Sequence, residues 1–487
     1  MSLLQTRWTQ LAALTAFLAA VGIQALRLKY CVLDFDIWWH LKVGDWILEH
    51  WSLPHSGILS RTAANLPWVA YSWGYEVLLS RAYTWFGLMG IGIFGVTLTM
   101  GVAFSCFWML RRLSARFWPA LILAAVTCYA FLFNGMPRPV FFSQMLFCIT
   151  LTLLFEAQRR AHVHLLYWLP PVFLLWANLH IQFIYGLFAV GLFVGVNLLL
   201  HLLVSFGFNL GHFVKPSLPL RSLLVVFGLC VLATILGPNF YHPYLVVWAY
   251  TKAKFAYTMI VELQPLTFRG FTDFVELFLA AAGFYAVGWQ KKIDVFKLIL
   301  LVVATVVAFR TMRDAWFVCF SAAACLADLS APETSKEHAY AWPEAITVAA
   351  AVLVLLFLAA PAADFNAGGL DRAISVSYPV NAVNFLRRNP VPGPLYNNLN
   401  WGGFLMWYLP ELPVAVDGRN DLYGDDLDRL FYHSESAFSS YTTDPYLNES
   451  GVVILDSHLP LAKVLTIDPR FRLIFHDDIA TVFARQQ

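Results

Sequence analysis

Residues 33–76 read LDFDIWWHLKVGDWILEHWSLPHSGILSRTAANLPWVAYSWGYE, a polar and aromatic stretch between two strongly apolar segments. Its first two acids, Asp34 and Asp36, follow an apolar run of about membrane-spanning length. Both are therefore expected near a membrane surface, where an unpaired carboxylate is costly to bury. The two acids have either a chemical task or the plain role of polar residues in a hydrated loop.

The composition of the whole chain is that of a polytopic membrane protein. Hydrophobic residues make up 59% of the 487 residues and charged residues only 13%, which is more apolar surface than a soluble fold can hide. The formal net charge of +2 offers no basic surface of the kind that nucleic-acid binding requires. We therefore expect a lipid bilayer as a partner, and no nucleic acid.

About eleven segments have the length and composition of membrane-spanning helices. They are residues 8–28, 84–110, 117–135, 139–158, 163–179, 181–205, 221–237, 273–290, 294–310, 315–329 and 344–362. Asn178, His180 and Gln182 predict a tight turn between the fifth and sixth segments. An odd number of spans places the termini on opposite sides, and Lys and Arg in the short loops favour a cytoplasmic N-terminus.

The composition changes after about residue 363, where long apolar runs stop and acids become frequent. We expect a membrane domain over 1–362, with a first external loop over 29–83, and a soluble extracytoplasmic α/β domain over 363–487. Its predicted helices are 379–388 and 425–438, and its predicted strands are 393–399, 412–418, 451–457, 472–478 and 480–486, the last two as a hairpin. Alternating strands and helices indicate a partly parallel sheet.

Polar side chains gather on the side of the membrane opposite the N-terminus. They are Asp34, Asp36, His40, Glu76, Arg138, Asn178, His180, Glu262, Gln264, Arg310 and Arg313. Carboxylates beside arginines suit a site that activates a nucleophile and holds a phosphate, because Asp can act as a general base and Arg binds phosphate through two hydrogen bonds. The end of the predicted strand 412–418 carries Asp417, Gly418, Arg419, Asp421 and Tyr423, at a position where α/β sheets tend to place ligand groups, although an Asp-Gly sequence is equally typical of a plain turn.

The same residues resemble the membrane glycosyltransferases of superfamily C, which have an acid after the first span, a long first external loop and an external C-terminal domain. The runs DFDIWWHLKVGDWILEH, SRTAANLPWVAYSW, WANLH and WGGFLMWYLPELPVAVDGRNDLYG are similar to those of one bacterial branch. The resemblance covers almost the whole chain. It implies a fold of about eleven membrane helices in a bacterial inner membrane, a polyprenyl-phosphate-linked sugar donor, and a glycan, lipid or protein acceptor.

Carried over residue by residue, Asp36 matches the acid that heads the family's first external helix, as catalytic base or metal ligand. Asp34 is the second candidate for either role, and a divalent cation, Mg or Mn, is the one cofactor implied. Many relatives carry two adjacent acids, whereas Ile37 follows Asp36 here. The spacing of Asp34 and Asp36 puts both carboxylates on one face of an extended segment but splays them in a helix.

Each candidate also has a structural interpretation. His40 could relay a proton or only pack, and Asn178 and His180 could bind substrate or only cap a turn. Arg138, Arg310 and Arg313 could bind the phosphate of the lipid carrier or extend to lipid headgroups. The tryptophans of residues 33–76 could stack on sugars or form an interfacial aromatic belt.

The leading hypothesis is an inverting membrane glycosyltransferase with Asp36 as its base. Asp34 and Glu262 would assist or hold a cation, and Arg138 with Arg310 or Arg313 would bind the phosphate of the carrier. The alternatives are a transporter or flippase of lipid-linked glycan, a non-catalytic membrane scaffold whose external domain binds a glycan or protein, and a ligase or polymerase of lipid-linked polysaccharide.

Overall fold

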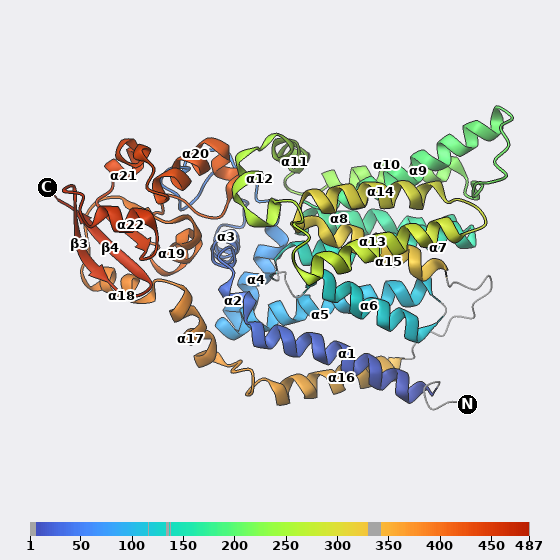
Figure 1. The fold of residues 1–487 in the computed structure, drawn as a ribbon, viewed down its shortest axis with the longest axis horizontal. Coiled ribbons are helices and arrows are strands. Elements are labelled where there is room, and N and C mark those ends of the chain that lie inside the picture. Colours follow the sequence, from blue (N-terminus) through green and yellow to red (C-terminus); the bar gives the residue numbers. More distant parts are fainter. Residues whose placement is uncertain (1–5, 115, 133–135, 137, 330–341, 487) are drawn as a thin grey trace. The chain divides into compact units, whose positions relative to one another are not determined.

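The structure, a computed structural model, describes residues 6–114, 116–132, 136, 138–329 and 342–486. Two compact units divide these residues. Unit 1 comprises Met1–Leu28, Gly95–Phe240 and Ile260–Ala363, and unit 2 comprises Lys29–Phe94, Tyr241–Met259 and Asp364–Gln487. The segment predicted as the first external loop thus belongs to the same unit as the C-terminal part of the chain (Figure 1).

The regular elements of unit 1 among its described residues are helices, joined by loops that include one isolated bridge between Phe213 and Ile293. Its elements are α1 (Arg7–Leu28), α5 (Leu88–Leu113, in this unit from Gly95), α6 (Phe117–Phe131), α7 (Val140–Arg160), η3 (Val163–Trp168), α8 (Leu169–Leu179), α9 (Phe183–Ser205), α10 (Leu220–Ile235), η4 (Val261–Leu263), α13 (Phe271–Trp289), α14 (Val295–Arg310), η5 (Met312–Asp314), α15 (Ala315–Leu329) and α16 (Trp342–Ala359).

A helix occupies each segment predicted to span the membrane, and the last residues of the segment 117–135 lie outside the described part. Among the described residues, five helical stretches are long and apolar enough to cross a membrane: Arg7–Leu33, Leu88–Leu113, Val140–Arg160, Phe183–Ser205 and Phe271–Trp289. The total of eleven spans and their orientation stay predictions. The predicted turn is confirmed, since α8 ends at Leu179 and α9 begins at Phe183.

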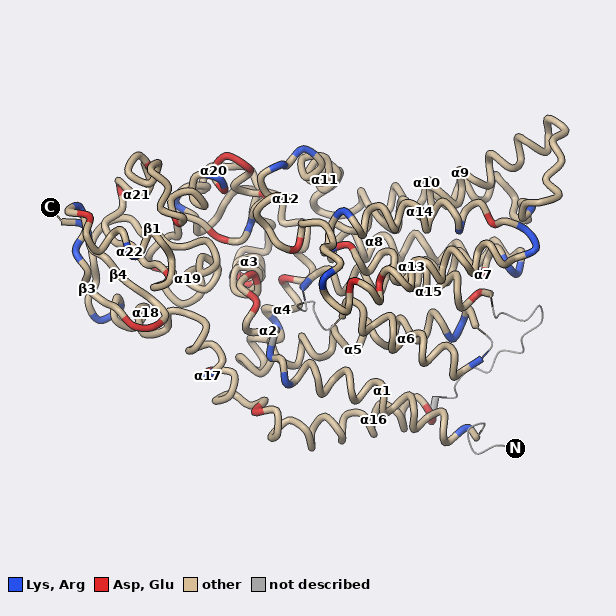
Figure 2. The backbone as a smooth tube through the Cα atoms, viewed as in Figure 1, with Lys and Arg blue, Asp and Glu red and all other residues tan. Residues whose placement is uncertain are grey.

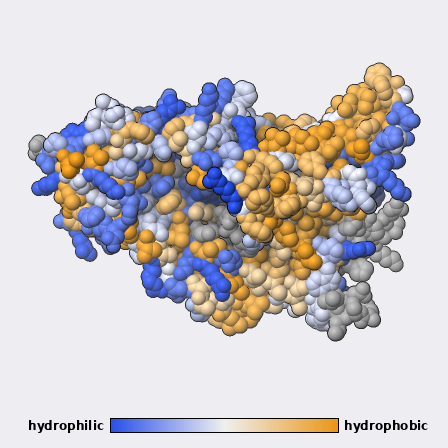
Figure 3. Space-filling model, viewed as in Figure 1, coloured by the Kyte–Doolittle hydropathy of each residue, from blue (hydrophilic) through white to orange (hydrophobic). Residues whose placement is uncertain are grey.

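The surface and charges of unit 1 match a bundle in lipid. Hydrophobic residues cover much of the surface over its helices (Figure 3), and Lys, Arg, Asp and Glu gather at the helix ends (Figure 2). At one such end, buried Glu156 on α7 accepts two hydrogen bonds from Arg112 on α5, at 2.9 and 2.8 Å. Arg159 and Arg160 approach the same carboxylate to 3.9 and 3.7 Å, so three cations surround one buried acid.

Unit 2 combines short helices with one sheet. Its elements are α2 (Tyr30–Leu33), α3 (Ile37–His50), α4 (Trp73–Phe86), α11 (His242–Lys252), α12 (Phe255–Met259), α17 (Ala367–Ser377), α18 (Val380–Arg388), β1 (Leu395–Asn397), η6 (Leu399–Trp401), α19 (Gly402–Tyr408), α20 (Asn420–Glu435), η7 (Ser439–Thr443), α21 (Pro445–Asn448), β2 (Val452–Asp456), α22 (Pro460–Leu465), β3 (Phe471–His476) and β4 (Ala480–Arg485).

The sheet has the order β1-β2-β4-β3, with β1 parallel to β2 and the other pairs antiparallel. Strand β2 is central, and Val452 to Leu455 are fully buried, which explains their continuous apolar sequence. Helices α18 and α22 pack against the sheet. The predicted hairpin of β3 and β4 and the partly parallel character of the sheet are confirmed.

The strand predicted over 412–418 is wrong. In its place, Val414 makes an isolated parallel bridge with Ser60, and the side chain of Asn397 takes the backbone groups that a neighbouring strand would have paired. Its Nδ2 donates to the Val416 carbonyl at 2.8 Å, and its Oδ1 accepts from the Ala415 amide at 2.8 Å. An apolar alternating segment thus lies buried without joining the sheet.

Helix α3 is held between α4 and α19 in unit 2. Glycines allow the close contacts, since a Cβ on Gly44 would lie 2.0 Å from the Glu76 carbonyl oxygen and one on Gly403 would lie 2.9 Å from the Trp39 amide nitrogen. Trp38 is fully buried and makes edge contacts with Tyr378 and Phe404. Several tryptophans of residues 33–76 therefore belong to the core of unit 2.

Candidate active site

The two acids of the opening stretch have different partners. Asp34 is buried, and its Oδ1 accepts a hydrogen bond from the Asp36 amide at 3.1 Å, which fixes the turn into α3. Asp36 is half-buried at the N-cap of α3, and its Oδ1 accepts from the Trp39 indole Nε1 at 3.0 Å. Asp34 thus contributes to the backbone turn, while Asp36 has a fixed side chain that remains partly open to solvent.

One turn further along α3, His40 forms a buried pair with Glu76 of α4. The His40 Nδ1 and Glu76 Oε1 atoms are 3.1 Å apart, and the residues are 5% and 1% exposed. Burial raises the pKa of Glu76 to about 8, although the positive charge of Arg419 acts in the opposite direction. The His40 ring stacks on Trp39 with centroids 3.5 Å apart, so the pair supports the residue that holds Asp36.

Asp417 and Arg419 form a second buried pair in the same unit. Both side chains are 0% exposed, and Arg419 donates to the two Asp417 carboxylate oxygens from Nε and Nη2 at 2.8 Å each. Burial lowers the pKa of Arg419 and the Asp417 charge more than offsets this, so the guanidinium stays charged. Tyr423 also donates to Asp417, at 2.5 Å. Because neither side chain reaches the surface, Asp417 and Arg419 can affect ligand binding only by positioning the residues around them.

The two clusters meet where α3 begins. A Cβ on Gly418 would lie 2.1 Å from Asp36 Oδ1 and 3.2 Å from Trp39 Nε1. Arg419 lies over the ring of Trp68 at 4.9 Å, and Trp68 in turn contacts Trp39 edge-on at 6.2 Å. Unit 2 therefore brings six predicted site residues into one neighbourhood. They are Asp34, Asp36, His40, Glu76, Asp417 and Arg419.

Ser60 and Ile58 of this neighbourhood have no predicted site role, whereas Asp421 and Tyr423 are predicted with Asp417 at the end of a strand. Asp421 accepts from Trp68 Nε1 at 3.0 Å, and burial raises its pKa to about 6. Ser60 contacts the Tyr423 hydroxyl at 3.0 Å, and the Ile58 carbonyl accepts from Arg419 Nη2 at 3.0 Å. The polar residues inside SRTAANLPW indicate that this stretch does more than form an aromatic belt at the membrane surface. The sequence does not show which residues they contact.

The other predicted site residues belong to unit 1. Arg138 forms an ion pair with Glu262 at 3.2 Å, and the Gln264 carbonyl accepts from the Met312 amide at 2.9 Å. This contact places η4 beside η5, which carries Arg313, and Arg310 is the last residue of α14. The basic residues predicted to bind phosphate therefore come from loops at helix ends of one unit.

At the α8–α9 turn, His180 and Asn178 have distinct surroundings. His180 is buried, and its Nδ1 lies 2.8 Å from the Ser143 hydroxyl, which also accepts from Trp176 Nε1 at 2.7 Å. Asn178 is half-buried, and its side-chain amide donates to the Leu174 carbonyl at 2.7 Å. The histidine thus belongs to a buried hydrogen-bond network, while the asparagine bonds back to its own helix.

The predicted divalent cation finds no formed site. Among the described residues, no group of three or more His, Cys, Asp or Glu side chains is arranged to hold a metal ion. Asp34 and Asp36 direct carboxylate oxygens at an amide and an indole instead. These residues do not fit a metal as they are arranged, so no catalytic step is derived through one, and the cation stays a prediction.

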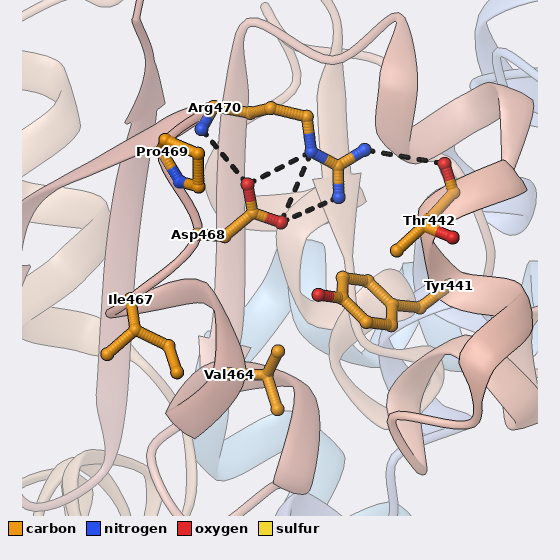
Figure 4. Close-up of a pocket in the computed structure, with 7 residues that line it drawn as sticks. All are labelled: Tyr441, Thr442, Val464, Ile467, Asp468, Pro469 and Arg470. Atoms are coloured by element: carbon orange, nitrogen blue, oxygen red, sulfur yellow. Dashed lines mark hydrogen bonds and ion pairs between the residues drawn. The ribbon is translucent and has the colours of Figure 1, made fainter.

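An open hollow of about 480 Å³ lies elsewhere in unit 2 (Figure 4). Asp468 and Arg470 form an ion pair along one side, with Nη2 and Oδ2 2.7 Å apart, and Val464 and Ile467 line another. The hydrogen bond from Arg470 lowers the pKa of Asp468. Because Asp468 and Arg470 neutralise each other, the lining of the hollow has little charge left to bind a ligand. None of the predicted site residues lines it.

Comparisons with known proteins found likeness at the level of structure. No family model and no curated protein matches the chain. The crystal structure of ArnT from Cupriavidus metallidurans bound to undecaprenyl phosphate is similar over 99% of this chain and 98% of that chain, with 13% sequence identity and a TM-score of 0.45. A similarity of this size does not identify an activity.

Proposed function

We propose that the chain is an integral-membrane, inverting glycosyltransferase that takes a sugar from a polyprenyl-phosphate-linked donor. The acceptor is a glycan, lipid or protein at the extracytoplasmic face. The observation that carries the proposal is the setting of Asp36. It is the one acid of the Asp34, Asp36 and Glu76 group that remains half-buried, and its Oδ1 is held by Trp39 at 3.0 Å.

This setting suits a general base. A base must reach the hydroxyl or amine of an acceptor, so it needs solvent access, and it must hold one orientation, so it needs a fixed hydrogen bond. Asp36 has both, while the other two acids are 1% exposed. The base removes the acceptor proton as the nucleophile attacks the anomeric carbon, and the lipid phosphate leaves from the opposite face, which inverts that carbon.

The lipid phosphate would be bound by the arginines of unit 1. Arg138 already pairs with a carboxylate, Glu262, whose side chain is 45% exposed. The donor phosphate gains a second negative charge as it leaves with the lipid, and a guanidinium can bind it through two hydrogen bonds. Arg310 and Arg313 would contribute further charge. Undecaprenyl phosphate, which the ArnT crystal structure contains, is a lipid of the class that this proposal requires.

The test compares transfer of radiolabelled sugar by membranes containing the wild type, Asp36→Asn or Asp45→Asn. Asp45 lies on the same helix, is half-buried like Asp36 and pairs with Lys42 at 3.5 Å, so its variant is the matched control. We expect Asp36→Asn to lower transfer by about 10²–10⁴-fold, the usual contribution of a general base, with normal membrane insertion. Undiminished transfer by Asp36→Asn would refute the role of Asp36.

A non-catalytic scaffold is the second candidate, and one observation favours it. Asp34 fixes a turn, and Asp417 and Arg419 neutralise each other at 0% exposure. Three predicted site residues therefore stabilise the fold. If the wild type transfers no sugar but binds lipid-linked glycan, and Asp36→Asn binds it equally well, the scaffold function is supported and the enzyme proposal fails.

A further inference from the structure

Helix α13, one of the helices long enough to cross a membrane, carries a carboxyl group on its buried face. That face consists of Glu276, Leu279, Ala280, Gly283, Ala286 and Val287, which follow the helical spacing of an apolar seam. Glu276 is 4% exposed. It therefore occupies a position in the helix–helix seam where the pattern calls for a hydrophobic residue.

The seam is closely packed. Helix α13 lies against α15, α6 and α14, and a Cβ on Gly283 would lie 2.9 Å from both Cα and Cβ of Ala322 on α15. Gly283 follows Glu276 by two helical turns on the same face. Water therefore has little room along this seam.

Within the described part of the chain, no Lys or Arg forms an ion pair with Glu276. Its Oε2 is buried without a hydrogen-bond partner among the residues that the structure describes. Its electrostatic neighbours are Asp273 on the same helix and the Cys319 thiol on α15. Helix α14 carries Lys297 and Arg310, but Lys297 pairs with Asp294 and Asp328, and α6 contributes the Cys128 thiol beside Cys319.

Asp273 makes ionisation of Glu276 still less favourable. Its carboxylate accepts hydrogen bonds from the amides of Arg269 and Gly270, at 3.1 and 3.3 Å. A second negative charge nearby, in a tightly packed interior with no cation, would be very costly, and a carboxyl group so placed takes up a proton instead.

We propose that Glu276 is an intramembrane proton-binding site, occupied in the resting bundle, and that the bound proton holds α13 against α15. The ligand is the proton itself. Losing it would leave a bare carboxylate in the seam, which must then open to admit water. This inference is independent of the proposed transferase activity, since it concerns the packing of unit 1 alone.

A hydrophobic carbodiimide tests the protonation state directly, because it dissolves in lipid and reacts with the acid form. The acid proton moves to one carbodiimide nitrogen, the carboxyl oxygen bonds to the central carbon, and the acyl group then migrates to nitrogen. Nothing leaves, so the modified peptide gains the mass of one reagent molecule. The full-length protein in native membranes is treated with dicyclohexylcarbodiimide at pH 7, digested and mapped by mass spectrometry.

The chain supplies its own controls. Glu156 is equally buried but paired with Arg112, and Glu262 is 45% exposed and paired with Arg138, so each control carboxyl group has the cationic partner that Glu276 lacks among the described residues. An ordinary glutamate at that pH is in its acid form only about once in 500 molecules, so we expect labelling of the Glu276 peptide about a hundredfold above either control. Equal labelling of the three peptides, or none at Glu276, would overturn the proposal.

The variant Glu276→Gln gives a second measurement. Glutamine imitates the neutral acid in size and polarity, so the variant is expected to fold, to lose the labelled peptide and to keep the thermal stability of the wild type at pH 6. A variant that fails to insert or unfolds at a markedly lower temperature at pH 6 would contradict the proposal, because it would show that the negative charge is needed.

Discussion

Replacing Asp417 with Asn is expected to destabilise unit 2 by about 3–5 kcal/mol, the usual cost of removing one partner from a buried ion pair. The carboxylate accepts from Arg419 Nε and Nη2 at 2.8 Å each and from Tyr423 at 2.5 Å. An amide keeps the shape but removes the charge and one acceptor. The Arg419 guanidinium, at 0% exposure, then remains charged without a counter-charge.

The assay is pulse proteolysis of the purified protein in detergent across a urea series, followed by detection of the C-terminal part. The matched control is Glu449→Gln, because Glu449 pairs with Arg61 at 3.3 Å with 67% of its side chain exposed, and such surface pairs contribute about 0–1 kcal/mol. The double variant Asp417→Leu with Arg419→Met removes both charges and should recover most of the loss.

If Asp417→Asn costs no more than Glu449→Gln, the reasoning is refuted, since the Arg419 charge would then be solvated in solution. A loss of about 3–5 kcal/mol that the double variant does not recover would also count against it, because the effect would come from packing and not from the unpaired charge.

Three further predictions follow from contacts in the two units. Gly418→Ala should lower sugar transfer severalfold while leaving the protein folded, because its Cβ would lie 2.1 Å from Asp36 Oδ1. The control is Gly368→Ala, whose Cβ would meet only ordinary contacts at 3.4 Å and beyond, and equal transfer by both variants would contradict the placement of Asp36. Glu76→Gln should flatten part of the pH dependence of stability. Burial raises the pKa of Glu76 to about 8, so the contribution of the protonated Glu76 to stability is full below the unfolded-state pKa near 4.5, falls as the pH rises and is lost by about pH 8. Urea midpoints of the wild type and the variant at pH 5 and 8 measure this effect, and the same midpoint difference in both proteins would argue against a protonated Glu76. Glu156→Gln should destabilise unit 1 by about 1.5–3 kcal/mol, because it weakens the charge-assisted hydrogen bonds from Arg112, whose side chain is 33% exposed. Arg160→Gln, which removes one 3.7 Å approach without a hydrogen bond, should cost under about 1 kcal/mol, and similar thermal shifts for the two variants would contradict the network.

The helices of unit 1 could be predicted because length and apolar composition decide a membrane helix with little help from tertiary contacts. Residues 412–418 could not be placed this way. Their alternation is typical of a strand, but the Asn397 side chain bonds to Ala415 and Val416. No local sequence pattern predicts that an asparagine side chain will make the backbone hydrogen bonds that a neighbouring strand would otherwise make.

The acids of the site show the same limit. The pattern around Asp34 and Asp36 predicted two carboxylates near a surface, and only the structure separates the one that fixes a turn from the one that faces solvent. The bond from Trp68 to Asp421 joins residues far apart in the chain, and Arg419 is buried by loop residues such as Ile58. Contacts of this kind depend on the folded arrangement and have no local signal.

The composition of unit 2 also sets an order of events during synthesis. Residues Lys29–Phe94 emerge early, but the partners that bury Trp38 and Trp68, including Phe404 and Arg419, lie in Asp364–Gln487. At about 5–20 residues per second, a ribosome needs tens of seconds to supply them. For that time the aromatic side chains of this segment lack the partners that bury them. A chaperone or the membrane surface must therefore keep the segment from aggregating until the last residues are synthesised.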